Sequence, residues 1–384
     1  MRFTWGAAYI FLWFYRTAFS VIGQTVILPL TIMSDTTGYQ QYNADNLGIL
    51  LDSTATELDI FMQVYANLIT SVVAAGFNIL SGGSAIANNI GFQTIAFAGL
   101  VYFFQGLDSR LRATMFVLAM TPSFTLWSSM TSKEAIVVGV SCVLLRYIVD
   151  IYRNKDRLGV HHLGAMVLLY IFKPHFLLAY AFVIGTSKLA RYVREPATLA
   201  LIGGALSLSS LYVFRRQVNS YALTISGWMH SEKGGSSRAT RFIAEQYDVF
   251  ARAPEGMLRS FIGPTMSEAT ESMLQMISYL ESLGIAVLLM IIFLVRLPRM
   301  PVYSAVMSFV TLFWIMFVTY PFGVANAGTA IRYRTDYLVL VFLCVAVLSS
   351  RQLYVEWRKG PVWPAARRRA AALARREAAA ARNP

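Results

Sequence analysis

The sequence is short of charged residues. Asp, Glu, Lys and Arg make up 14% of its 384 residues, while 56% are hydrophobic and the mean hydropathy is +0.53. A soluble domain carries about 25% charged residues, so this chain has roughly half of what a water-facing surface needs. Several apolar runs approach the ~20 residues that span a bilayer. The composition excludes a soluble enzyme, a secreted disulfide scaffold and a disordered chain, and it predicts an all-α integral membrane protein.

Cysteine is scarce, and familiar catalytic motifs are absent. The two cysteines, Cys142 and Cys344, lie inside apolar runs, where we expect them to act as small hydrophobic residues. No HExxH, GxSxG, Walker or paired Cys/His pattern is present, so metalloprotease, hydrolase and nucleotide-binding functions have no support. We expect no cofactor, although the acidic pair Glu57 and Asp59 could hold a divalent metal ion.

The net charge of +13 is concentrated at the C-terminus. Residues 351–384 hold nine Lys or Arg against two Glu, a balance of +7 that exceeds half of the total. A basic tail directly after an apolar segment is typical of a cytoplasmic anchor that contacts anionic lipid headgroups. Because the tail offers few aromatic side chains to stack on bases, we expect no nucleic-acid partner.

The distribution of Lys and Arg predicts how the chain threads the membrane. Residues 34–59 contain five acids and no Lys or Arg, so we place them outside. The short basic linkers belong inside with the tail, at 108–112, 153–157, 188–194 and 296–299. The chain then divides into a multi-pass membrane domain, 1–350, and a basic cytoplasmic tail, 351–384. The membrane domain has about ten crossings, and both termini are cytoplasmic.

The crossings are separated by two large outer loops, 34–87 and 216–278. We expect the helices at about 10–33, 88–107, 113–121, 134–152, two within 162–190, 197–214, 279–297, 303–321 and 335–350. Residues 58–80 are expected to lie at the outer interface, because a crossing there would reverse the side of every later linker. The run 162–190 is too long for one crossing. Its central Lys173-Pro174-His175 is expected to join two short helices at an outer apex that borders a cavity.

Candidate functional residues gather on the expected outer face. Asp35 follows the first helix, Lys133 and Glu134 end a Ser/Thr-rich run, Lys173 and His175 lie at the apex, and Arg332 and Arg334 precede the last helix. Charges at membrane depth are costly, so each is a functional hypothesis. One carboxylate facing several fixed cations suits a reaction in which a hydroxyl is deprotonated while a diphosphate departs.

Each of these residues also has a structural explanation. Asp35 could orient a loop, and Lys133 with Glu134 could begin a helix. Lys173 could extend to outer headgroups. The two arginines could be membrane anchors, although Lys and Arg are disfavoured on the outer side, and a phosphate is their natural partner.

The layout resembles a known enzyme class. An acidic first outer loop with Asp35 and Tyr39, followed by interfacial helices, resembles the C-type (GT-C) glycosyltransferases, multispanning enzymes that use polyprenyl-phosphate-linked sugar donors. Three segments are similar to the bacterial exopolysaccharide and O-antigen polymerases of that class: PSFTLWSSMTSKE (122–134), KPH (173–175) and NAGTAIRYR (326–334). The family more often has Arg-Pro-His at the apex, so Lys173 is a departure. The layout covers residues 1–350, and the short motifs cover a small part of it.

The resemblance implies a role for each candidate residue. Asp35 would be the general base that activates an acceptor hydroxyl, and attack opposite the leaving group would invert the anomeric centre. The polyprenyl diphosphate would be bound by Lys133, Lys173, His175, Arg332 and Arg334. Sugar subsites would involve Tyr39, Trp127, Glu134 and Tyr333. The cations would make a metal unnecessary.

The implied function is polymerisation of oligosaccharide repeat units on the outer face of a bacterial inner membrane. The partners would be a polyprenyl-diphosphate-linked oligosaccharide and a growing glycan acceptor. Within the class, an O-antigen ligase or a single-sugar transferase is the alternative. Outside it, a flippase or transporter for a lipid-linked oligosaccharide would use the same cations for binding alone, although no internal repeat of the usual transporter kind is evident.

Overall fold

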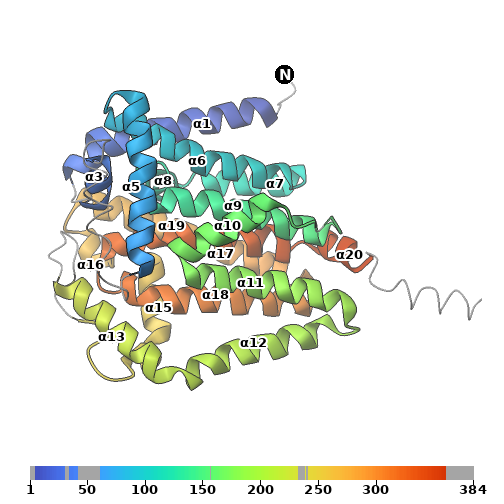
Figure 1. Ribbon diagram of the computed structural model, residues 1–384. Coiled ribbons are helices and arrows are strands. Elements are labelled where there is room, and N and C mark those ends of the chain that lie inside the picture. The colour runs from blue at the N-terminus through green and yellow to red at the C-terminus, as the bar shows by residue number, and fades with distance from the viewer. Residues whose placement is uncertain are drawn as a thin grey trace, which may run out of the picture.

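The chain is almost entirely helical in a computed structural model (Figure 1). The structure describes residues 5–30, 34–41, 61–155, 157–231, 238 and 241–359, and no extended strand occurs among them. The longer helices are α1 (Trp5–Ile22), α5 (Phe61–Ser81), α6 (Ala85–Gln105), α7 (Ser109–Ala119), α9 (Lys133–Tyr152), α10 (Val160–Phe172), α11 (Pro174–Leu189), α12 (Pro196–Val213), α13 (Arg215–Ser231), α15 (Ala253–Ile262), α17 (Met273–Arg296), α18 (Val302–Gly323), α19 (Ala327–Leu343) and α20 (Arg351–Lys359). The shorter ones are α2 (Leu28–Leu30), α3 (Ser34–Gln40), α8 (Pro122–Trp127), α14 (Asp248–Ala251) and α16 (Met266–Ala269). The all-α prediction is confirmed.

Several helices have the length and hydropathy of membrane spans. Six qualify, at Trp5–Leu30, Ala85–Gln105, Lys133–Tyr152, Pro196–Val213, Met273–Arg299 and Val302–Gly323. A seventh qualifies if Ala327–Leu348 and α20, which meet at 64°, count as one broken span. The chain is therefore a multi-pass membrane protein. The expected ten crossings are not established, because α7, α10 and α11 have 11, 13 and 16 residues.

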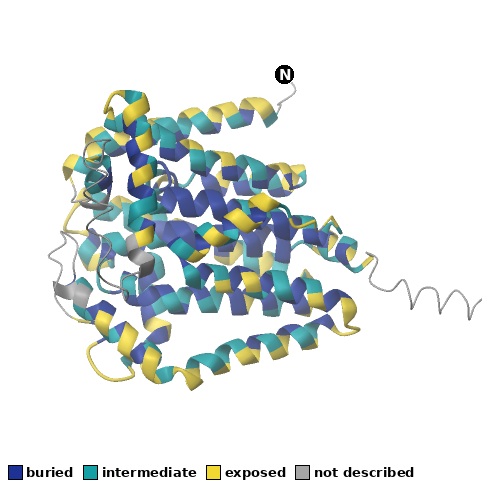
Figure 2. Ribbon diagram, viewed as in Figure 1, coloured by how far each residue is buried: buried dark blue, intermediate teal, exposed yellow. Residues whose placement is uncertain are grey.

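The long helices lie side by side between two ends of the bundle (Figure 1). Helices α3, α13 and α16 lie at one end, which we call the α3 end. Helix α20 lies at the other, which we call the α20 end. Helix α5 lies across the bundle at the α3 end instead of along it. The expected location of residues 58–80 at the outer interface stays a prediction. Buried residues fill the middle of the bundle, while α1 and α12 at its periphery have few buried residues (Figure 2).

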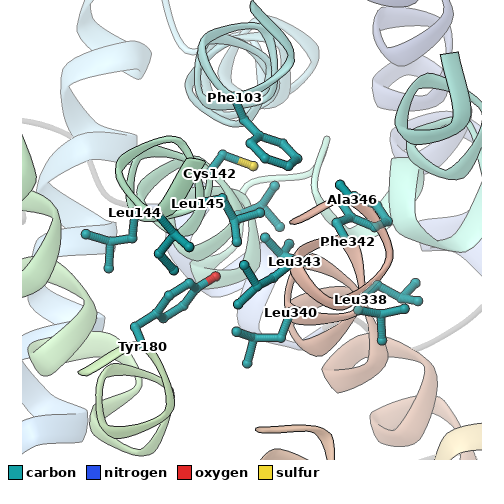
Figure 3. Packing of buried hydrophobic residues seen from close by; sticks show 14 of the residues in the cluster. Phe103, Cys142, Leu144, Leu145, Tyr180, Leu338, Leu340, Phe342, Leu343 and Ala346 are labelled. Carbon is teal, nitrogen blue, oxygen red and sulfur yellow. The ribbon is translucent and has the colours of Figure 1, made fainter. Parts of the chain in front are cut away.

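The core is built around α6, α9 and α19. Helices α6 and α9 approach closely where Gly99 faces Gly139. A Cβ on Gly99 would lie only 2.4 Å from the carbonyl oxygen of Gly139, so a larger residue would not fit. The packed side chains include Phe103 of α6, Leu145 of α9, Tyr180 of α11 and Leu343 of α19 (Figure 3). Both cysteines, Cys142 and Cys344, are buried and unbonded.

Local sequence signals set the helix boundaries. The Ser132 side chain caps α9 by accepting a hydrogen bond from the Ala135 amide. Pro174 begins α11, and Lys173 before it leaves the helical region with φ −150° and ψ 73°. The break expected within 162–190 is thus present.

The last core helix begins earlier than expected. Asn326 caps α19 by accepting from the Thr329 amide, so the helix starts at Ala327. Arg332 and Arg334 therefore lie inside this helix, and their predicted position before it is wrong.

The folded part of the chain extends into the expected tail. Helix α20 bends against the bundle, and the buried ring of Trp357 stacks on Tyr303 with centroids 5.0 Å apart and on Tyr152 at 5.4 Å. Residues 360–384 lie outside the described part of the structure.

Candidate functional site

Five charged residues meet near the α3 end of the bundle. We call Lys133, Glu134, Lys173, Arg332 and Asp336 the charge cluster. The Lys173 ammonium lies 3.1 Å from Asp336 Oδ2, and Arg332 Nε donates a hydrogen bond of 2.8 Å to Glu134 Oε1. The side chains of Glu134 and Asp336 are 1% and 0% exposed. Three cations and two carboxylates therefore share one largely dehydrated region with an excess of one positive charge.

Three separate parts of the sequence supply the charge cluster. Lys133 and Glu134 form the first turn of α9 because Ser132 caps it. Lys173 lies at the break between α10 and α11 that Pro174 imposes. Arg332 and Asp336 are four residues apart in α19, so they share one face of that helix. The cluster thus joins α9, α19 and the helix break.

Aromatic rings border the cations of the charge cluster. Lys173 Nζ lies 3.7 Å from the centroid of the Tyr333 ring, and Arg332 Cζ lies 5.7 Å from that of Trp127. The Tyr333 ring in turn contacts Phe322, with centroids 5.1 Å apart. Cations over aromatic faces are stabilised by the ring quadrupole, more so when dehydrated. Trp127 and Tyr333, predicted to line sugar subsites, therefore lie beside the predicted diphosphate ligands.

Helix α3 reaches the charge cluster through a shared amide. Asn67 of α5 accepts hydrogen bonds of 2.8 Å from Lys133 Nζ and 2.8 Å from the Tyr39 hydroxyl. Tyr39 lies one helical turn after Asp35 in α3. The Asp35 side chain lies outside the described residues, so its predicted role as the base stays a prediction.

A partly buried amide cluster fixes α3 against the bundle. It consists of Gln24, Gln40, Asn89 and Thr131. Gln40 Nε2 donates to Gln24 Oε1 and to Asn89 Oδ1, both at 3.0 Å. The amide and hydroxyl of Thr131 donate to the same Asn89 oxygen at 2.9 and 2.7 Å. These bonds connect α3 with the α1 region, with α6 and with the turn before α9.

Two residues predicted to bind the diphosphate, Arg334 and His175, are not members of the charge cluster. Arg334 lies two residues after Arg332, on another face of α19, and is fully buried. It donates to the hydroxyls of Ser123, at 2.9 Å, and Ser282. Arg334 therefore links α19 to α8 and α17 and is not part of the charge cluster. His175 follows the helix break, and its Nε2 is buried with no hydrogen-bond partner among the described residues.

Sequence reasoning missed Asp336. The NAGTAIRYR segment ends at Arg334, and Asp336 lies in the apolar run that follows it. Two signals could have found it: it is a carboxylate within a membrane helix, and it lies four residues after Arg332. The amide cluster was also missed, because neutral side chains from distant segments leave no pattern in the sequence.

Among the described residues, no group of three or more His, Cys, Asp or Glu could hold a metal ion. Glu57 and Asp59, the acidic pair considered for a divalent ion, lie outside the described residues.

Comparisons with protein-family models, with curated proteins and with solved structures found no match to this chain.

Proposed function

We propose that this chain is a membrane glycosyltransferase of the C type that uses a polyprenyl-diphosphate-linked sugar donor. The observation that carries the proposal is the charge cluster. Three cations from three separate parts of the chain are brought together beside two aromatic rings, near one end of a membrane bundle. A buried charge is costly unless it is compensated, so such a concentration of cations is suited to a multiply charged anion.

The diphosphate would bind to Lys133, Lys173 and Arg332. The guanidinium group of Arg332 offers a planar pair of donors, whereas the lysines act as point charges. Asp336 and Glu134 keep Lys173 and Arg332 oriented before the donor arrives. Asn67 does the same for Lys133. Preorganised charge of this kind stabilises a departing diphosphate without the cost of reorienting water. Trp127 and Tyr333 offer apolar faces against which a sugar ring can pack.

The reaction would proceed by inversion at the anomeric carbon. An acceptor hydroxyl loses its proton to Asp35 as its oxygen attacks the anomeric carbon, while the bond from that carbon to the diphosphate oxygen breaks. The electron pair of the broken bond stays on the diphosphate, where the three cations stabilise it. Arg334 has no part in this scheme, because it is engaged by Ser123 and Ser282.

The finer proposal is polymerisation of oligosaccharide repeat units. The partners would be a polyprenyl-diphosphate-linked oligosaccharide and the growing glycan. The resemblance of segments 122–134, 173–175 and 326–334 supports this choice. We also propose that the protein lies in the bacterial inner membrane, with both termini in the cytoplasm and the α3 end outside. The ten proposed crossings include the short helices α7, α10 and α11.

A lipid-linked oligosaccharide transporter is the second candidate. The observation that favours it is the break at Lys173, since transporters use discontinuous helices at their substrate sites. In a transporter, the same cations would bind the diphosphate without any bond being broken.

One assay separates these functions. The purified full-length protein would be mixed with extracted polyprenyl-diphosphate oligosaccharide, and the products sized on a gel. The comparison is with Asp35→Asn and with Asp52→Asn, a matched change in the same acidic segment. We expect a ladder of longer glycans from the wild type and from Asp52→Asn, and none from Asp35→Asn. A single added unit would indicate a transferase or ligase. Movement of the lipid-linked oligosaccharide across the bilayer of liposomes, without any new glycan, would instead establish the transporter.

A further inference from the structure

A basic cavity lies at the α20 end, away from the charge cluster. Its volume is about 300 Å³, and it lies between the start of α7, the end of α17 and the turn that joins α19 to α20. Four arginines line it: Arg110, Arg296, Arg299 and Arg351. The one carboxylate in its lining is Asp108.

The cavity has a positive charge that its own carboxylate does not balance. Asp108 is already engaged at the start of α7, where it accepts hydrogen bonds of 3.0 Å from the amides of Arg110 and Leu111. Four guanidinium groups against one carboxylate leave an excess of three positive charges. The side chains of Arg110, Arg299 and Arg351 are exposed and form no hydrogen bond or ion pair with other described residues. Like charges held together in this way are stabilised by an anion.

Part of the cavity is preorganised. Arg296 donates hydrogen bonds of 2.5 Å to the Val345 carbonyl and 2.7 Å to the Ser349 hydroxyl, which fix its guanidinium group in the wall. Ser350, Arg351 and Gln352 also line the cavity, and α20 begins at Arg351. The positive end of the α20 dipole therefore adds to the arginine charges.

The neighbouring surface of α17 is apolar and exposed. Ile291, Leu294 and Val295 are 51%, 62% and 60% exposed, and Val295 also lines the cavity. In a membrane protein such a face contacts acyl chains. The basic cavity and this face together match a molecule with a phosphate at one end and hydrocarbon at the other.

We propose that the cavity binds the phosphate of an anionic phospholipid from the leaflet at the α20 end. The phosphate group would be held by Arg110, Arg296, Arg299 and Arg351, while the acyl chains lie along α17. The site is independent of the proposed glycosyl transfer, which takes place near the other end of the bundle. It is also distinct from the basic residues beyond Lys359.

Retention of lipid by the full-length protein tests the proposal. The protein would be purified in detergent with added phosphatidylglycerol or phosphatidylcholine, and the lipid adducts counted by native mass spectrometry. The test variant replaces Arg110, Arg299 and Arg351 by Gln and leaves the wall residue Arg296 intact. The matched control replaces Arg153, Lys155 and Arg157 by Gln, with the same change of charge in another basic linker. A third variant replaces Arg367, Arg368 and Arg369 by Gln.

We expect the wild type to retain phosphatidylglycerol over phosphatidylcholine. The cavity variant should retain it at least about tenfold less, since each basic residue near an anionic lipid surface contributes ~1 kcal/mol. The two control variants should behave as the wild type. Equal loss in the cavity variant and the linker control, or loss in the tail variant alone, would overturn the proposal. If inorganic phosphate displaces bound phosphatidylglycerol as effectively as added phosphatidylglycerol does, the ligand is a free phosphate, and the lipid assignment is overturned.

A thermal unfolding scan without added lipid shows whether the cavity variant is folded. If it is not, Arg351→Gln alone gives the same comparison, with a smaller expected loss.

Discussion

Lys173 and Asp336 form a buried ion pair that joins the helix break between α10 and α11 to the middle of the core helix α19. The two charged groups are 3.1 Å apart, and the carboxylate side chain is completely buried. The helix break is thus held in one place by a charge from a distant segment. This pairing gives the candidate site its fixed geometry.

The pair is expected to behave as a coupled unit in stability. Lys173→Met or Asp336→Asn alone should destabilise the protein by about 3–5 kcal/mol, because each leaves an uncompensated buried charge. The double variant should recover a large part of the loss. Unfolding followed by tryptophan fluorescence in detergent measures the three variants. A double variant as unstable as the sum of the singles would mean that the two residues do not interact.

Activity separates a structural pair from a functional one. If the pair only holds the helices together, the double variant should regain activity along with stability. We expect it to stay inactive in the glycan assay, because Lys173 is also a proposed ligand of the diphosphate.

Arg332 and Arg334 are expected to differ although they lie two residues apart. Arg332→Gln should lower the rate by about 10²–10³, the usual effect of removing one preorganised electrostatic donor. Arg334→Gln should instead lower the stability, by about 1–3 kcal/mol, because it leaves the buried Ser123 hydroxyl unpaired. The Ser282 hydroxyl keeps its bond to the Ser278 carbonyl. Rate and unfolding midpoint should be measured on both variants. The reverse pattern would place the phosphate ligand on the other face of α19.

The amide cluster is expected to control the placement of α3. Asn89→Leu removes the acceptor used by Gln40 and Thr131, which costs about 1–3 kcal/mol for each group left unsatisfied. It should also lower kcat more than it raises KM for the donor, because α3 carries Asp35. Gln93→Leu is the matched control, since Gln93 lies one turn further along α6 and bonds Thr17 instead of α3. An equal loss of kcat in both variants would argue against positioning.

The segment around Glu268 is expected to loosen in acid. Partial burial favours a raised pKa for Glu268, but hydrogen bonds from Arg238 and from the Thr265 amide outweigh it and lower the pKa below its ordinary 4.5. A carboxylate with a lowered pKa contributes stability above that ordinary value, and the contribution is lost as the pH falls through the lower pKa of the folded state.

Hydrogen exchange measured from pH 6 down to about pH 3 tests this contribution. The protection of residues 263–271 in the wild type should fall toward that of Glu268→Gln as Glu268 becomes protonated. The exposed Glu271→Gln is the control and should follow the wild type. A constant difference between the wild type and Glu268→Gln across this range would contradict the prediction.

Much of the helical layout could be predicted from the sequence because its signals are local. Pro174 within an overlong apolar run predicted the break, and Ser132 before Lys133 marks the start of α9. The helix expected at 58–80 is observed as α5. The sequence predicts the start of α19 too late, because Arg332 and Arg334 precede its most apolar stretch, whereas the Asn326 cap sets the boundary six residues earlier than Arg332.

The site could be predicted only in part because its partners are distant in sequence. Lys133, Lys173 and Arg332 were found as unusual cations, and the structure brings them together. Asp336 was overlooked because the sequence alone does not show which face of α19 meets Lys173. Gln24, Gln40 and Asn89 are neutral, so neither charge nor hydropathy indicated that they would bond one another.

The shortness of α10 has a consequence for the membrane itself. A helix of 13 residues rises about 20 Å, whereas the hydrocarbon core of a bilayer is about 30 Å thick. If α10 crosses, its exposed apolar residues cannot match the full thickness, and thinning of the lipid beside the helix is one way to accommodate the difference. Such thinning would bring the membrane surface down toward Lys173, so that a lipid headgroup could meet the charge cluster without being pulled out of its leaflet.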